Sequence, residues 1–201
     1  MTSTAQADSG GIYEFVAQKV HLLYTAISSN NPTAKAQLSN LRKAVGKNPA
    51  HNPLAWQYVI SDQEQARFPE RLRGRGDQPS ASENAIYLAL TLYAVHQQAE
   101  QKMMHQPQTS FGYAVGQLVA QHTPSIKKRF DAMLQARTFA ALTYHARNLI
   151  QLLKQEAIGF NYGKFAQDLA LLQHPQYKTK IITRWSRDFV IGYQSHRTPS
   201  N

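Results

Sequence analysis

The chain has 201 residues, enough for one domain or two small ones, and it contains no cysteine. The absence of cysteine excludes disulfides, thiolate metal sites and a cysteine nucleophile, and it is compatible with a reducing compartment. Lysine and arginine number 22 against 12 aspartates and glutamates, which gives a formal net charge of +10. From Ile126 onward twelve basic residues oppose four acidic ones, a balance of +8. This asymmetry predicts a polyanionic partner, nucleic acid first and a membrane surface second, against the alternative of a merely soluble basic protein.

No apolar run approaches the roughly 18 residues that a membrane-spanning helix needs. The first eleven residues are polar and lack the apolar region of a signal peptide. We therefore expect a soluble, cytoplasmic protein.

The sequence pattern predicts helices along most of the chain. Apolar residues recur at helical spacing in 12–28, 33–45, 54–60 and 111–121, and again in a pair of helices over 124–154. Residues 83–98 are apolar nearly all round, which predicts a central helix, and Ser80 with Glu83 has the spacing of a capping box. Two further helices are expected over 158–173 and 176–193. The sequence predicts an all-α protein of about eight or nine helices, as two small bundles packed in tandem. The N-terminal bundle spans 12–108, and the basic C-terminal bundle spans 109–194.

The helix pair at 124–154 combines a buried seam with a cationic outer surface. In the first helix, Lys127, Lys128 and Arg129 point away from an apolar stripe. In the second, which Thr138 is expected to cap, the polar side carries Tyr144, Arg147, Gln151 and Lys154. Tyr144 could stack on a nucleobase, although a partly exposed tyrosine packed along its helix is the more common situation.

Other basic residues lie at the ends or on the outer sides of helices. Arg42 lies along the margin of the apolar face of the helix at 33–45, and Lys43 lies further out. Lys180, Arg184 and Arg187 are spaced along the side of the last helix opposite its apolar stripe. Residues 66–79 form a loop with four arginines, which could follow a phosphate backbone or could equally have no partner.

The residue types of a catalytic or metal site do not occur at the required spacings. The sequence has no HExxH motif and no phosphate-binding glycine loop. His21, His96 and His145 lie in or beside helical seams, where a hydrogen-bonded structural role is favoured. Asp131, Asp168 and Asp188 fall on different helices, and each has a simpler role: Asp188 can pair with Arg184, and Asp131 lies near Lys127 and Lys128. We expect no catalytic residue, cofactor or metal.

Seven segments occur in an order that resembles a known family. They are LRKAVG (41–46), ENAIYLALTLYAVHQQ (83–98), TSFGYAVGQL (109–118), KKRFDAMLQA (127–136), LTYHARNLIQLLK (142–154), FNYGKFAQDL (160–169) and WSRDFVIGY (185–193). Together they resemble the CasB family, the small subunits of the type I-E CRISPR surveillance complex called Cascade. The resemblance extends from about Tyr13 to Tyr193.

The resemblance implies a fold of two helical bundles and a non-enzymatic role. Two copies sit head to tail in the complex and help to hold an R-loop open, beside the guide RNA, the target DNA and the displaced single strand. The large subunit and the backbone subunits are the implied protein partners. Base pairing reads the sequence in such complexes, so a subunit of this kind needs no base-reading motif. The residues that match the family's basic positions are Arg42, Lys43, Lys127, Lys128, Arg129, Arg147, Arg184 and Arg187.

Two other functions stay open at this point. The helix pair at 124–154 could act as the helix-turn-helix of a free-standing transcriptional regulator, but its second helix would begin with Phe139, Ala140 and Ala141, which are poor residues for reading bases. A metal-dependent nuclease would require that the separated aspartates Asp131, Asp168 and Asp188 converge in space.

Overall fold

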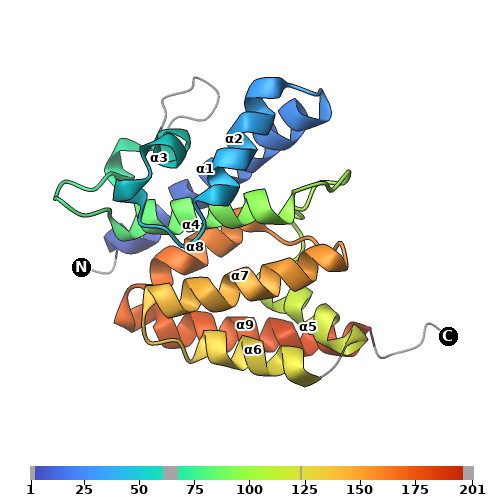
Figure 1. The fold of residues 1–201 in the computed structure, drawn as a ribbon. Helices are drawn as coiled ribbons and strands as arrows, with labels where there is room; N and C mark the ends of the chain where they lie inside the picture. Colours follow the sequence, from blue (N-terminus) through green and yellow to red (C-terminus); the bar gives the residue numbers. More distant parts are fainter. Residues whose placement is uncertain (1–2, 61–67, 123, 197–201) are drawn as a thin grey trace.

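The computed structural model describes residues 3–60, 68–122 and 124–196. Over these residues the chain forms nine α-helices and two 3₁₀ helices, with one isolated bridge between His105 and Phe160 (Figure 1). The helices are α1 (Ser3–Ser28), α2 (Pro32–Lys43), α3 (Pro53–Ile60), α4 (Ala81–His96), α5 (Phe111–Gln121), α6 (Pro124–Leu134), α7 (Phe139–Gln155), α8 (Tyr162–Leu172) and α9 (Pro175–Ser195). The 3₁₀ helices are Pro49–His51 and Glu70–Leu72. The predicted all-α class and helix number are confirmed.

Helices begin after residues whose side chains accept hydrogen bonds from the otherwise unpaired backbone N–H groups of the first helical turn. Ser80 and Glu83 form the predicted capping box at α4, and the Thr138 hydroxyl accepts a hydrogen bond from the backbone N–H of Ala141 at the start of α7. Two helix starts differ from the prediction by more than two residues. α1 begins upstream, at Ser3, and α8 begins only at Tyr162. The second difference arises because Phe160 is extended and exchanges backbone hydrogen bonds with Met104 and Gln106.

α4 is the central helix, as its all-round apolar sequence predicted. Thirteen of its sixteen residues are buried, and it packs against α1, α2, α3, α7 and α8. α8 packs in turn against α1, α4 and α9, so apolar contacts extend across residue 108. The division into bundles at 12–108 and 109–194 stays a prediction. None of the described helices combines the length and apolar character that crossing a bilayer needs.

Two histidines are buried on either side of Tyr162. The Nδ1 atom of His96 lies 2.9 Å from the Tyr162 hydroxyl, and Nδ1 of His105 accepts a hydrogen bond of 3.0 Å from the Tyr162 backbone N–H. The structural role predicted for His96 is therefore confirmed, whereas His145 is half-buried and His21 is exposed. Because His105 accepts at Nδ1, its neutral form is the one that fits the fold.

α5 and α9 approach each other so closely that backbone of one helix meets glycine of the other. A Cβ atom at Gly116 would overlap the carbonyl oxygen of Phe189. We expect Gly116→Ala to lower the free energy of unfolding by about 1 to 3 kcal/mol, because the helices must separate to admit the methyl group. The midpoint of thermal unfolding should fall by about 2 to 4 °C per kcal/mol.

Gly76→Ala is the matched control for this substitution. A Cβ atom at Gly76 would meet nothing within 4 Å, so this variant should have the same midpoint of thermal unfolding as the wild-type chain. Equal melting temperatures for both variants would contradict the close approach of α5 and α9.

Candidate nucleic-acid interface

α7 presents an apolar stripe to the core and a polar face to the outside. Its buried residues are Leu142, Ala146, Leu149, Ile150 and Leu153. On the other side Tyr144, Arg147 and Gln151 are exposed, and Lys154 is half-buried. No acidic residue occurs between Phe139 and Gln155, so the helix contributes only positive formal charge to this surface. Figure 1 shows α7 at the front of the molecule, with α6 below it.

The structure brings cations from three segments to the two sides of α7. Lys47, from the connection after α2, lines one cleft together with Arg147. Arg129, from α6, lines a second, more open groove with Lys154. The Lys154 ammonium also lies 3.4 Å from the side-chain oxygen of Gln98. We call Lys47, Arg129, Arg147 and Lys154 the α7 surface.

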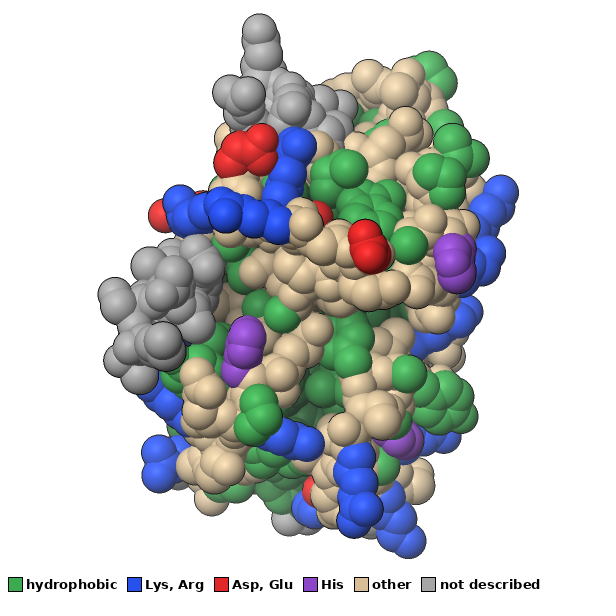
Figure 2. All heavy atoms as spheres, turned by 90° about the vertical axis from the view of Figure 1, so that its left-hand side faces the viewer, with side chains coloured by type: hydrophobic (Ala, Val, Ile, Leu, Met, Phe, Trp, Pro, Cys, Tyr) green, Lys and Arg blue, Asp and Glu red, His purple; other side chains and the backbone are tan. Residues whose placement is uncertain are grey.

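Charge is also unevenly distributed on the side of the molecule seen at the left of Figure 1. Figure 2 shows lysine and arginine side chains over the lower part of this side and along its right-hand edge, and others in its upper part, where most of the acidic side chains also lie. The right-hand edge is the side that faces the viewer in Figure 1, where α7 lies. On this face, basic side chains with few acidic neighbours therefore gather in the lower part and toward the side where α7 lies.

The three consecutive cations of α6 are not equivalent. Lys127 forms an ion pair of 2.7 Å with Asp131, one helical turn away, as the predicted position of Asp131 near Lys127 suggested. Lys128 and Arg129 are exposed. Part of the Lys127 charge is therefore balanced within its own helix, and Arg129 is the member of the three that reaches the α7 surface.

The basic residues near the N-terminal half are spread over two segments. Lys43 is exposed in the last turn of α2, whereas Arg42 is half-buried. In the arginine-rich loop, Arg73 pairs with Glu70 at 3.3 Å, and Arg67 lies outside the described residues. A nucleic-acid contact by this loop stays a prediction.

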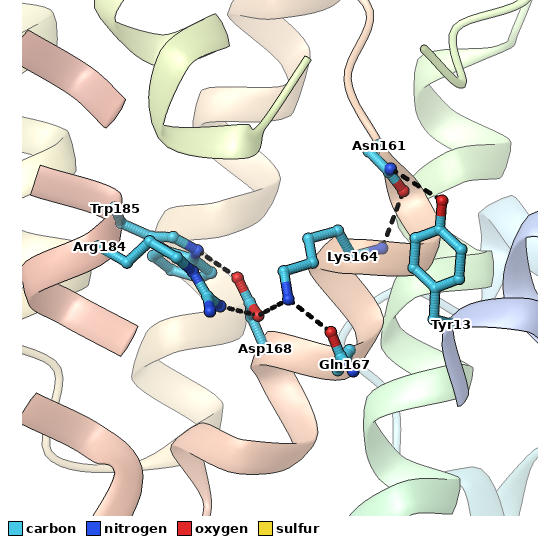
Figure 3. Close-up of polar contacts among 7 residues, drawn as sticks. All are labelled: Tyr13, Asn161, Lys164, Gln167, Asp168, Arg184 and Trp185. Carbon is cyan, nitrogen blue, oxygen red and sulfur yellow. Dashed lines mark hydrogen bonds and ion pairs between the residues drawn. The ribbon is translucent and has the colours of Figure 1, made fainter. Parts of the chain in front are cut away.

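Arg184 corrects one prediction. The sequence suggested Asp188 as its partner, but the guanidinium pairs with Asp168 of α8, which is only 2% exposed (Figure 3). The Trp185 indole N–H donates to the same carboxylate at 2.7 Å, and the Lys164 ammonium lies 3.9 Å from it. The i+4 spacing was misleading because α8 and α9 pack face to face. Lys180 and Arg187 are exposed on α9, as predicted.

The Asp168 cluster is a structural ion-pair site. Burial raises the pKa of the Asp168 carboxyl, and the Arg184 guanidinium opposes that rise. Burial also lowers the pKa of Lys164, which Asp168 opposes. Within the part of the chain that the structure describes, no group of three or more histidine, aspartate or glutamate side chains could hold a metal ion. Asp131, Asp168 and Asp188, all within the described residues, do not form such a group.

Lys47 and Lys154 of the α7 surface were not among the predicted site residues. Lys154 stood on the predicted polar face of its helix, so the periodicity could have included it. Lys47 follows Gly46 after the end of the predicted helix, so it belongs to no run of apolar residues at helical spacing. Its position opposite Arg147 depends on the packing of α2 and α4 against each other and of α4 against α7.

Comparison with known proteins identifies relatives of the whole fold. Residues 37–189 match the family of the CRISPR-associated protein Cse2. The crystal structure of CasB from Thermobifida fusca is 31% identical, with 89% of this chain and 97% of that chain covered and a TM-score of 0.74. No relative is found among curated protein sequences.

Two more distant structures share the fold. A Cse2-family protein from Thermus thermophilus is 20% identical, with 87% of this chain and 97% of that chain covered and a TM-score of 0.64. A chain of a CRISPR RNA-guided surveillance complex is 17% identical, with 92% and 96% covered and a TM-score of 0.68. Because the family match covers most of the chain, and because the Thermobifida protein matches nearly end to end, this chain belongs to the Cse2 family of CRISPR-associated proteins.

Proposed function

We propose that this chain is the non-enzymatic small subunit of a type I-E Cascade complex and that it stabilises the R-loop by binding nucleic-acid backbone without reading sequence. Membership of the Cse2 family supports the assignment to a CRISPR complex. The shared fold of a chain from an RNA-guided surveillance complex is consistent with it. The proposed partners are the large and backbone subunits, a second copy of this chain, the guide RNA and the target DNA, in the cytoplasm.

The α7 surface is the observation that carries the proposal. Its four cations come from three segments, and two of them, Arg147 and Lys154, lie on a helix that has no acidic residue; Glu100 is the one carboxylate among the described residues that line the two hollows. Phosphate contacts of this kind position a strand and carry no sequence information. R-loop formation exchanges one duplex for another at nearly equal free energy, so a few such contacts can shift the balance toward the open state.

The test uses complexes assembled with guide RNA and the other subunits, with and without this chain. R-loop persistence is followed by permanganate reactivity of the displaced strand. We expect omission of the chain to shorten R-loop lifetime, and we expect Arg129→Gln combined with Arg147→Gln to do the same. In the isolated chain, loss of two phosphate contacts should reduce the slope of log affinity against log salt for single-stranded DNA by about 1.4.

Lys35→Gln combined with Lys102→Gln is the matched control. Both lysines are exposed and lie outside the α7 surface, and the change in net charge is the same. If the control shortens R-loop lifetime as much as the test variant does, total charge matters and the α7 surface does not. If omission of the chain has no effect, the proposed function is wrong.

The cations predicted on α2, α6 and α9 remain candidates for further backbone contacts. Lys43, Lys128, Lys180 and Arg187 are exposed and can reach a strand. Arg42, Lys127 and Arg184 are half-buried or paired within the chain, so we expect smaller effects from them.

The regulator hypothesis is less compatible with this arrangement. A recognition helix inserts its N-terminal end into the major groove. Here Phe139 and Ala140, at that end of α7, line a cleft shared with residues 46–49 and 78–88 of the N-terminal half. Selection of one consensus site from random duplexes would support the regulator instead.

A further inference from the structure

The cleft beside the first half of α7 has the composition of a nucleotide-binding pocket. It lies between α7 and two segments of the N-terminal half, at 46–49 and 78–88, and has a volume of about 540 Å³, within the range of small-molecule sites. Among the described residues that line it, Lys47 and Arg147 are the only charged ones. The cleft is therefore suited to a ligand that combines negative charge with a ring.

An exposed aromatic ring stands at this cleft. Tyr144 is 66% exposed, although most large apolar side chains of the chain are buried. The Tyr144 and His145 rings lie edge to face, with 5.3 Å between their centroids. A tyrosine ring left in solvent beside two cations matches the way in which single-strand binders combine stacking platforms with backbone contacts.

Other side chains that line the cleft supply both hydrogen-bond donors and hydrogen-bond acceptors. Gln78 and Asn84 provide side-chain amides, and the Asn84 amide is oriented by donating to the carbonyl oxygen of Pro79 at 3.2 Å. Thr143 donates its hydroxyl proton to the carbonyl oxygen of Phe139, so its oxygen can only accept from a ligand. The edge of any nucleobase offers donors and acceptors to such groups, whereas a base inside a duplex is stacked and paired and cannot enter.

We infer that this cleft receives one unpaired nucleotide of single-stranded DNA, with its base stacked on Tyr144 and its phosphate held by Arg147 and Lys47. The inference rests on the proposed function, because an R-loop supplies a displaced DNA strand to the surface on which the cleft opens. It adds a stacking contact to the backbone contacts. The chain would thus retain a displaced base as well as its phosphate.

The test places 5-iododeoxyuridine at successive positions of the displaced strand in the assembled complex and irradiates it. Crosslinked peptides are then identified by mass spectrometry. We expect one position to crosslink to the tryptic peptide that runs from residue 138 to residue 147 and contains Tyr144. Tyr144→Phe keeps the ring and should keep the crosslink. Tyr144→Leu keeps only apolar bulk, and we expect the crosslink yield to fall about tenfold, as loss of a stacked base implies.

Ile191→Ala is the matched control, because Ile191 is also a large exposed apolar side chain but lies on α9. It should leave the crosslink unchanged. A second readout is permanganate, which oxidises unstacked thymine. A thymine at the crosslinked position should be protected by the wild-type chain and by Tyr144→Phe, and should become reactive with Tyr144→Leu.

The inference and the proposed function fail in different ways. If R-loop lifetime depends on the chain but no position crosslinks to this peptide, or if Tyr144→Leu retains the full yield, the cleft does not hold a base and the proposed function stands. If omission of the chain does not alter R-loop lifetime, both are wrong.

Discussion

Asp168→Ala is expected to lower the free energy of unfolding by about 3 to 5 kcal/mol, the usual cost of removing one partner of a buried ion pair. The carboxylate is 2% exposed and holds the Arg184 guanidinium, the Trp185 indole N–H and the nearby Lys164 ammonium. Its removal leaves these donors without their shared acceptor at the junction of α8 and α9. Urea unfolding, followed by circular dichroism, measures the effect.

Asp131→Ala is the control that separates burial from charge. Asp131 also pairs with a lysine, but its side chain is 38% exposed, and such surface pairs contribute at most about 1 kcal/mol. The free energy of unfolding of Asp168→Asn should lie between those of Asp168→Ala and the wild-type chain, because an amide oxygen can still accept a hydrogen bond from the Trp185 indole N–H. If Asp168→Ala and Asp131→Ala lower the free energy of unfolding by the same small amount, Asp168 does not stabilise the junction of α8 and α9.

Acidification from pH 6.5 to pH 4.5 is expected to lower the free energy of unfolding by about 5 kcal/mol through two buried histidines. Burial lowers the pKa of His96 from 6.5 to about 3, and burial, assisted by His21, lowers the pKa of His105 from 6.5 to about 4. Below pH 6.5 the unfolded chain binds two protons that the folded chain does not. Stability is therefore complete above pH 6.5 and is lost as the pH falls, at about 1.4 kcal/mol per pH unit for each histidine.

His105→Asn tests this assignment, because the asparagine oxygen can accept the hydrogen bond from the Tyr162 N–H without titrating. Unfolding free energies measured from pH 7.5 to pH 4.5 should show a slope that is lower by about 1.4 kcal/mol per pH unit in this variant. Parallel curves for His105→Asn and the wild-type chain would show that His105 does not titrate as its burial implies.

The elements that the sequence predicted well are those with strong local signals. The stripe of α7, the all-round apolar α4 and the caps at Ser80 and Thr138 each depend on residues within a few positions of one another, and all four are confirmed. The start of α8 was wrong because the pairing of Phe160 with Met104 joins segments far apart in the chain. Periodicity carries no information on such contacts.

The sequence by itself determined that this chain is helical, basic in its C-terminal part and similar to the CasB family, because composition, helical period and motif order are all local or linear properties. Only the tertiary structure decided which cations lie near one another. Helix packing places Lys47 opposite Arg147, turns Arg184 toward the buried Asp168 and leaves the Tyr144 ring at the mouth of a cleft. These relations arise between residues that are tens of positions apart, where the free energy of burying the shared core fixes the geometry.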